Sequence, residues 1–174
     1  MKKGTRGFSL IELLIVVAII LIIAAIAIPN LLRSRIAANQ ASAVGSLRTL
    51  NTAEVTYSTT YNTGYSATLS DLGPPAAASP TPTSTAAGLI DEVLAGTLTP
   101  GGSAATPQTS QKSGYQFVYT PGAVTGTAIT TYTITASPIS PGTTGTNYYF
   151  TDQSGVIRQN STTTASSTDS PLAG

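Results

Sequence analysis

An unbroken apolar stretch near the N-terminus limits what this chain can fold into. Every residue from Leu13 to Ile28 is apolar, and residues 8–12 add only Ser9 and Glu12 as polar members. A helix of residues 8–28 rises roughly 30 Å, which is the thickness of a bilayer hydrocarbon core. The stretch is too long and too uniformly apolar for the core helix of a water-soluble domain. We therefore predict a helix that spans a membrane or an equally apolar environment.

A short basic segment precedes the apolar stretch, and its charged residues are Lys2, Lys3 and Arg6. These cations favour a cytoplasmic N-terminus with the rest of the chain outside. Arg33 and Arg35 on the other side weaken this charge bias without removing it. Two ordinary interpretations are a conventional signal peptide cleaved after Ala27 and a plain single-pass anchor.

Glu12 argues against both ordinary interpretations. A carboxylate in an apolar segment costs up to about 2.5–3.5 kcal/mol if it reaches the bilayer centre, and less near an edge. We expect no cation of this chain to reach Glu12. Acidic residues in such places usually have a partner and a function, so Glu12 is a candidate functional residue.

The sequence Gly7-Phe8-Ser9-Leu10-Ile11-Glu12, followed by the apolar stretch, closely resembles the class III prepilin signal. That signal marks type IV pilins and the pseudopilins of type II secretion. The resemblance implies that a prepilin peptidase cleaves between Gly7 and Phe8, and that Phe8 is then N-methylated. Removal of the leader, residues 1–7, takes away three of the eight basic residues and leaves five against seven acidic ones.

In the family that the chain resembles, Glu12 of one subunit would meet the new Phe8 ammonium of a neighbour. Each charge is costly in an apolar filament core, and pairing offsets much of that cost. The resemblance also implies a helical homopolymer, built from the inner membrane by a platform protein and an assembly ATPase. The subunit would be single-pass with a cytoplasmic N-terminus before assembly. Afterwards it would form a pilus that spans the periplasm or lies at the cell surface.

Pro29 follows the apolar stretch and predicts a helix kink, because proline removes a backbone hydrogen bond. Beyond it, an intermittent apolar stripe predicts that the same helix continues to about Ser58 with one buried face. The stripe comprises Leu32, Ile36, Ala43, Leu47, Leu50 and then Ala53 or Tyr57. We divide this helix into a membrane or filament-core part, 8–30, and an amphipathic part, 31–58.

The rest of the chain predicts a globular domain over 59–160 and a flexible Ser/Thr-rich tail over 161–174. A short helix over 86–95, with Thr85 as N-cap and Gly96 as its stop, is expected between a loop at 73–88 and a polar loop at 97–113. Alternating β-rich segments predict strands at 115–119, 129–136, 147–151 and 155–158. The expected fold is α+β and pilin-like, with a long N-terminal helix packed on a small antiparallel sheet of three to four strands.

Composition removes several classes of function. The chain has no Cys and no His, which excludes thiolate chemistry, disulfides and histidine general acid–base catalysis. We find no phosphate loop or dinucleotide motif, expect no cofactor, and predict that the protein is not an enzyme. Asp152 stands nearly alone, without the several oxygen ligands that calcium needs, so no metal site is predicted. The scattered cations give no specific nucleic-acid site.

Three functions remain open from the sequence. The first is a structural subunit of a type IV pilus-like filament, serving adhesion, motility or DNA uptake. The second is a type II secretion pseudopilin, although the loop carboxylates that bind calcium in some pseudopilins are scarce here. The third is a membrane-anchored binding domain that never polymerises.

Overall fold

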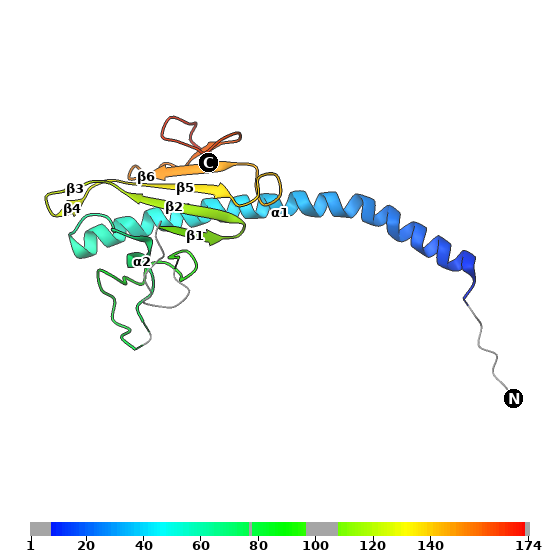
Figure 1. The fold of residues 1–174 in the computed structure, drawn as a ribbon, viewed down its shortest axis with the longest axis horizontal. Helices are drawn as coiled ribbons and strands as arrows, with labels where there is room; N and C mark the ends of the chain where they lie inside the picture. Colours follow the sequence, from blue (N-terminus) through cyan, green and yellow to red (C-terminus); the bar gives the residue numbers. More distant parts are fainter. Residues whose placement is uncertain (1–7, 77, 97–107, 173–174) are drawn as a thin grey trace. The chain divides into compact units, whose positions relative to one another are not determined.

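A single long helix organises the structure. The computed structural model describes residues 8–76, 78–96 and 108–172, and its contacts divide the chain into two units, residues 1–35 and 36–174. Helix α1 (Leu10–Tyr61; Figure 1) runs through both units and lies close to the helix predicted over 8–30 and 31–58. It remains helical across Pro29, which lies inside it.

The C-terminal unit contains an antiparallel sheet with the strand order β1-β2-β5-β6-β7. These strands are β1 (Thr109–Lys112), β2 (Tyr115–Pro121), β5 (Tyr132–Pro138), β6 (Tyr148–Asp152) and β7 (Arg158–Asn160). A separate hairpin is formed by β3 (Val124–Thr125) and β4 (Ala128–Ile129). The predicted α+β fold, with a long N-terminal helix and a small antiparallel sheet, is confirmed.

The sheet has one strand more than the largest number predicted. The additional strand is β1, in the segment that we expected to be polar loop over 97–113; residues 97–107 lie outside the described residues. Ser113 and Gly114 both have positive φ and form a two-residue turn that pairs Lys112 with Tyr115. Such a turn matches the twist of a hairpin, so it recruits a polar segment into the sheet.

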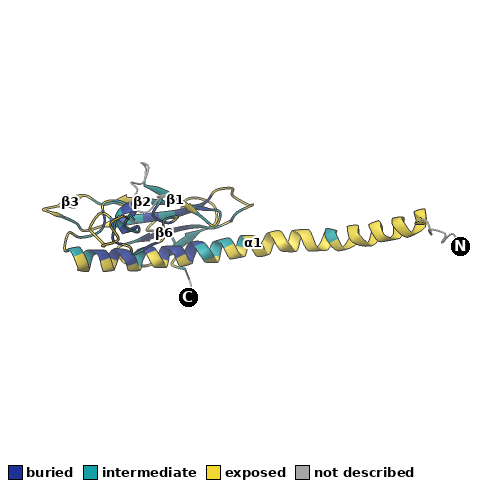
Figure 2. Ribbon diagram, turned by 90° about the horizontal axis from the view of Figure 1, so that it is seen from below, coloured by how far each residue is buried: buried dark blue, intermediate teal, exposed yellow. Residues whose placement is uncertain are grey.

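The second half of α1 packs on the sheet. Alternate residues of β2 and β5 are buried, as expected for strands with one face on a core. Figure 2 shows that the buried residues of α1 lie in its second half. The core brings together Ala43, Leu47, Leu50, Ala53 and Tyr57 of α1 with Tyr115, Phe117, Tyr119, Tyr132, Ile134 and Ala136 of the sheet. The predicted stripe begins too early, because Leu32 is exposed and Ile36 is only half-buried.

The prediction of a short helix over 86–95 is wrong. The amides of Ala87, Leu89 and Ile90 donate to the carbonyls of Asp71 and Leu72, so the backbone of this segment is held by another segment. Only one turn forms, from Asp91 to Gly96. The predicted cap Thr85 therefore caps no helix, whereas Gly96 does end the turn, with φ of 73°.

Helix α2 (Leu69–Leu72) was not predicted. Thr68 and Asp71 form a capping box: the Asp71 amide donates to Thr68 Oγ1 at 3.2 Å, and the Thr68 amide donates to Asp71 Oδ2 at 2.9 Å. The carbonyls at the end of α2 accept the amides of the segment around Leu89. These hydrogen bonds explain why the helix predicted over 86–95 is absent: amides in its first half bond to the carbonyls of α2 and not to carbonyls of their own segment.

Residues 161–172 follow a folded course along β7, in contrast to the flexible tail predicted over 161–174. The Gln159 amide donates to the Ser170 carbonyl at 3.0 Å, and the Leu172 amide donates to the Ile157 carbonyl at 2.8 Å. Ala165 is buried, and Asn160 Nδ2 donates to Asp169 Oδ1 at 2.8 Å. The Ser/Thr-rich composition gave no sign of these contacts, which depend on the free edge of β7.

One carboxylate lies inside the core of the C-terminal unit. Glu54 is fully buried, and its carboxylate accepts hydrogen bonds from the Ser66 amide at 2.9 Å and the Ser66 hydroxyl at 2.6 Å. The Tyr119 hydroxyl donates to the Ser66 carbonyl at 2.7 Å. Burial raises the pKa of Glu54, while hydrogen bonds from Ser66 and Tyr119 act in the opposite direction. This cluster links α1, the segment after it and β2.

The raised pKa of Glu54 predicts how stability changes with pH. The unfolded chain ionises this group above about pH 4.3, the usual value for glutamate, while the folded chain resists ionisation. The free energy of unfolding should therefore fall as pH rises toward the folded-state pKa, by at most about 1.4 kcal/mol per pH unit. Glu54→Gln keeps the size of the side chain and removes this titration.

Denaturant unfolding of the full chain in detergent, followed from pH 4 to pH 8, checks this prediction. The wild-type protein should lose stability relative to Glu54→Gln as pH rises. Using the difference between the two proteins cancels the titration of other carboxyls, among them Asp71, whose pKa is also raised by burial. Parallel pH profiles would show that Glu54 does not titrate differently in the folded state.

The packing also predicts opposite effects for two glycine-to-alanine substitutions. A Cβ at Gly145 would overlap the hydroxyl end of the fully buried Tyr115, which already donates to the Asn147 carbonyl at 2.8 Å. Gly145→Ala should therefore destabilise the domain by about 1–3 kcal/mol. Gly45 is helical with open space around it, so Gly45→Ala should stabilise by roughly 0.5–1 kcal/mol. Thermal unfolding measures the stability of both variants. Equal changes in stability would contradict a steric overlap between a Cβ at Gly145 and Tyr115.

Candidate functional site at the start of the apolar helix

The start of α1 brings Ser9 and Glu12 together. The Ser9 amide donates to Glu12 Oε2 at 2.8 Å, and the Ile11 amide donates to Ser9 Oγ at 3.3 Å. The first backbone hydrogen bond of the helix runs from the Leu13 amide to the Ser9 carbonyl at 3.2 Å. Ser9 is thus the N-cap, and with Glu12 at the third helical position it forms a variant capping box, in which Ser9 Oγ accepts the amide of Ile11 instead of that of Glu12. Phe8 precedes the helix and is exposed.

This arrangement gives the Glu12 carboxylate a local partner. The donor is a neutral amide of its own chain, and the carboxylate also lies at the positive end of the helix dipole. Glu12 makes no ion pair within the described residues. The basic residues of the segment 1–7 lie outside the described part. This hydrogen bond uses one of about four acceptor sites on the carboxylate, so the others remain available for an additional donor.

The predicted site residues do not form one cluster. Phe8 and Glu12 lie in the same turn, whereas Gly7 is outside the described residues. Pro29 is 17 residues beyond Glu12, about 26 Å along a helix, so it belongs to a different part of the molecule. Its missing amide leaves the Ala25 carbonyl without its usual helical donor, and the kink at Pro29 stays a prediction.

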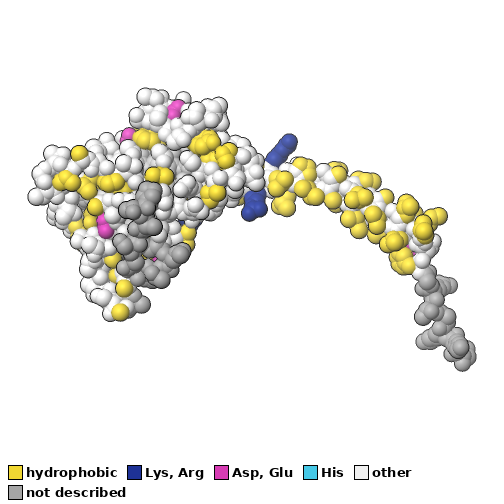
Figure 3. All heavy atoms as spheres, in the orientation of Figure 1, with side chains coloured by type: hydrophobic (Ala, Val, Ile, Leu, Met, Phe, Trp, Pro, Cys, Tyr) yellow, Lys and Arg dark blue, Asp and Glu magenta, His cyan; other side chains and the backbone are white. Residues whose placement is uncertain are grey.

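The apolar part of α1 is exposed along its whole length. Its large side chains from Phe8 to Leu32 are all exposed, and α1 is the one helix of the described residues long and apolar enough to cross a membrane. Figure 3 shows these side chains in yellow on both sides of the helix, with basic side chains where the yellow segment ends. Exposure of this much apolar surface to water is unfavourable, so the helix requires a lipid or protein environment.

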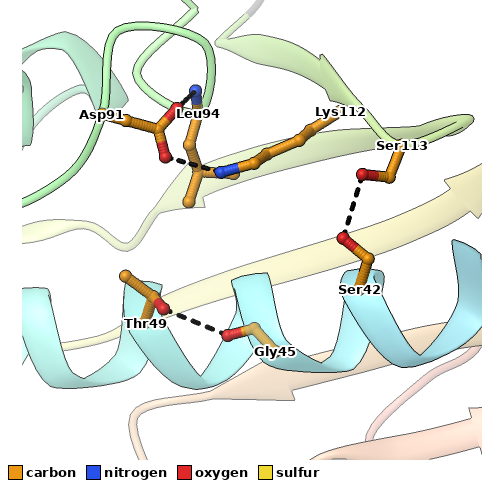
Figure 4. A network of polar contacts seen from close by, with 7 residues as sticks. All are labelled: Ser42, Gly45, Thr49, Asp91, Leu94, Lys112 and Ser113. Atoms are coloured by element: carbon orange, nitrogen blue, oxygen red, sulfur yellow. Dashed lines mark hydrogen bonds and ion pairs between the residues drawn. The ribbon is translucent and has the colours of Figure 1, made fainter. Parts of the chain in front are cut away.

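The most prominent charged contact elsewhere has a structural role. Lys112 Nζ lies 2.6 Å from Asp91 Oδ2, and Asp91 Oδ1 accepts the Leu94 amide at 3.0 Å (Figure 4). Burial opposes ionisation of Asp91, but the hydrogen bonds from Lys112 and Leu94 prevail and lower its pKa. The pair ties the turn after Asp91 to β1. Within the described residues, no group of three or more His, Cys, Asp or Glu side chains could hold a metal ion.

Comparison with known families gives one match, which covers the same part of the chain. Residues 2–28 match the family model of the prokaryotic N-terminal methylation motif. The match includes the Gly7–Phe8 junction, the capping box and the apolar stretch. The class of signal inferred from Gly7, Phe8 and Glu12 is therefore the class that the family model describes.

Two curated relatives are type IV pilus proteins. The chain is 52% identical over 52 residues to the type IV major pilin protein PilA of Myxococcus xanthus, which covers 30% of this chain and 24% of that protein. It is 62% identical over 37 residues to the type IV wide pilus major component PilA4 of Thermus thermophilus, covering 21% of this chain and 28% of that protein. The chain thus matches only about a quarter of the length of these relatives. No solved structure matches the chain significantly.

Together, the motif, these relatives and the α+β fold confirm the resemblance to type IV pilins that the sequence suggested. The chain carries an N-terminal methylation motif and is similar to type IV pilus proteins over part of its length. The relatives are named as pilus components rather than as enzymes.

Proposed function

We propose that this chain is a structural subunit of a type IV pilus-like filament. The observation that carries the proposal is the match of residues 2–28 to the methylation motif, on a helix whose apolar side chains are exposed. A prepilin peptidase would cut the Gly7–Phe8 bond and methylate Phe8. The precursor would lie in the inner membrane with a cytoplasmic N-terminus, and a platform protein and an ATPase would assemble it into a homopolymer.

In this proposal, assembly gives Glu12 a second and stronger partner. The capping box supplies a neutral donor, the Ser9 amide. A hydrogen bond from a charged ammonium to the carboxylate is stronger than one from a neutral amide. Cleavage creates that ammonium at Phe8, so an uncleaved neighbour cannot offer it. The carboxylate can keep the Ser9 amide and accept the ammonium of a neighbour as well, because it has acceptor sites to spare. Processing would thereby permit assembly.

Among the filament types, the relatives favour a pilus over a secretion pseudopilus, because both are named as major pilus components. In a pilus, the C-terminal unit would form the outer surface of the filament, available for adhesion, motility or DNA uptake. A binding domain that never polymerises would leave the Phe8 amine and Glu12 without a function.

The first experiment is to determine the N-terminus of the mature protein. Mass spectrometry of the membrane fraction and of sheared surface filaments should find a chain that begins at N-methylated Phe8. The same chain should be present in the sheared fraction. A chain that begins after Ala27, or that retains Met1 in both fractions, would refute processing at Gly7–Phe8.

Variants of Glu12 separate its two roles. Glu12→Gln can still accept the Ser9 amide, because glutamine also serves in capping boxes, but it carries no charge. Glu12→Ala loses both the cap and the charge. We expect both variants to be inserted and cleaved but to yield few filaments, since neither can pair with the Phe8 ammonium.

Shearing assays and immunoblots of cleaved and uncleaved protein measure these outcomes. Glu92→Gln is a matched control, because Glu92 is an acidic side chain of the C-terminal unit and far from the cap in sequence. If Glu12→Gln assembled normally while Glu12→Ala did not, helix capping would be the important role. The charge pairing proposed here would then be wrong.

A further inference from the structure

Two arginines follow directly after the exposed apolar stretch of α1. Arg33 and Arg35 are both exposed, and within the described residues neither donates a hydrogen bond nor makes an ion pair. The residues before them, Leu31 and Leu32, are exposed and apolar. The change from apolar to basic side chains is therefore abrupt, and it occurs on a helix that continues without interruption.

The spacing of the two arginines restricts what can bind both. Residues two apart in an α-helix are separated by about 200° around the axis and about 3 Å along it. Arg33 and Arg35 therefore point to opposite sides of α1 at nearly the same level. One face of a protein partner cannot reach both side chains. A layer of anions that surrounds the helix can.

The distance to Glu12 indicates what kind of layer this is. Arg33 lies 21 residues after Glu12, which corresponds to about 32 Å along the helix, close to the roughly 30 Å of a hydrocarbon core. Placing the capping box at one membrane interface therefore places both guanidinium groups at the other. Long arginine side chains reach headgroups from the edge of an apolar segment.

We propose that Arg33 and Arg35 bind phosphate groups of lipid headgroups in the outer leaflet of the membrane that holds the unassembled subunit. The planar guanidinium group matches phosphate with two parallel hydrogen bonds and stays charged at all relevant pH values. The proposal rests on the membrane-anchored precursor proposed above. It adds a lipid partner at the end of α1 opposite to Glu12.

In this proposal the arginines retain the processed subunit in the membrane until it is assembled. Loss of residues 1–7 would remove the basic side chains on the cytoplasmic side, while Arg33 and Arg35 remain on the other. The balance of basic residues that favours a cytoplasmic N-terminus is then reversed. The headgroup contacts hold the processed subunit at the outer interface until assembly replaces them.

Solid-state NMR of the full chain in vesicles tests the lipid contact. The protein carries arginine labelled with ¹³C at the guanidinium carbon, in vesicles of phosphatidylethanolamine and phosphatidylglycerol in phosphate-free buffer. Dephasing of this ¹³C signal by lipid ³¹P reports proximity to phosphate. We expect a component of the dephasing that is lost in Arg33→Gln/Arg35→Gln and retained in Arg48→Gln. Arg48 is an exposed arginine of the same helix and serves as the matched control.

Each other outcome overturns the proposal. Equal dephasing in wild type and in the double variant would mean that these arginines do not contact headgroups. Equal dephasing by inorganic phosphate in a phosphorus-free detergent would indicate general phosphate association. Guanidinium-to-carboxylate ¹³C contacts without ³¹P dephasing would assign the arginines to a second copy of the chain, through half-buried acids such as Glu92 or Asp152.

Carbonate extraction shows separately whether the double variant is inserted, and limited proteolysis shows whether its C-terminal unit is folded. A failure of the filament proposal is seen in the sheared fraction of cells. The vesicle experiment uses unassembled protein, so it can fail or succeed independently of that result.

Discussion

The structure depends on one helix that must bury apolar side chains in two different surroundings. The first half of α1 exposes aliphatic side chains on all sides, so no packing within the chain satisfies it. The second half has one buried face and one exposed polar face, which is the pattern of a helix that covers a sheet. Because both halves belong to one continuous helix, the folded domain is covalently joined to a segment that requires an apolar environment.

Polar groups are placed where this helix changes surroundings or meets the domain. At its start, Glu12 and Ser9 satisfy amides that a helix leaves without acceptors. In the domain, Glu54 takes a position that the apolar stripe would otherwise fill, and it satisfies the backbone and side chain of Ser66. A buried carboxyl group without its donors would be very costly, so Glu54 holds Ser66, in the segment after α1, against the helix.

The sequence predicted the long helix and the sheet because their signals are long and regular. It missed Glu54, although the spacing of three or four from Leu50 to Glu54 and on to Tyr57 places the carboxylate on the buried face. An acidic residue is usually assigned to solvent, and the partner that reverses this, Ser66, lies beyond the helix end. The wrong prediction of a helix at 86–95 has a similar cause. Its amides bond to carbonyls of Asp71 and Leu72, and a local pattern cannot show such contacts.

At the N-terminus, the pattern Ser9-x-x-Glu12 is itself a capping box signature that the sequence could have given. The geometry changes the energetic argument for Glu12. A carboxylate that already accepts an amide in its own chain is not an unpaired charge in search of any cation. In the proposed filament, its gain on assembly would be the difference between an ammonium and a lipid or water neighbour, added to a hydrogen bond that can persist.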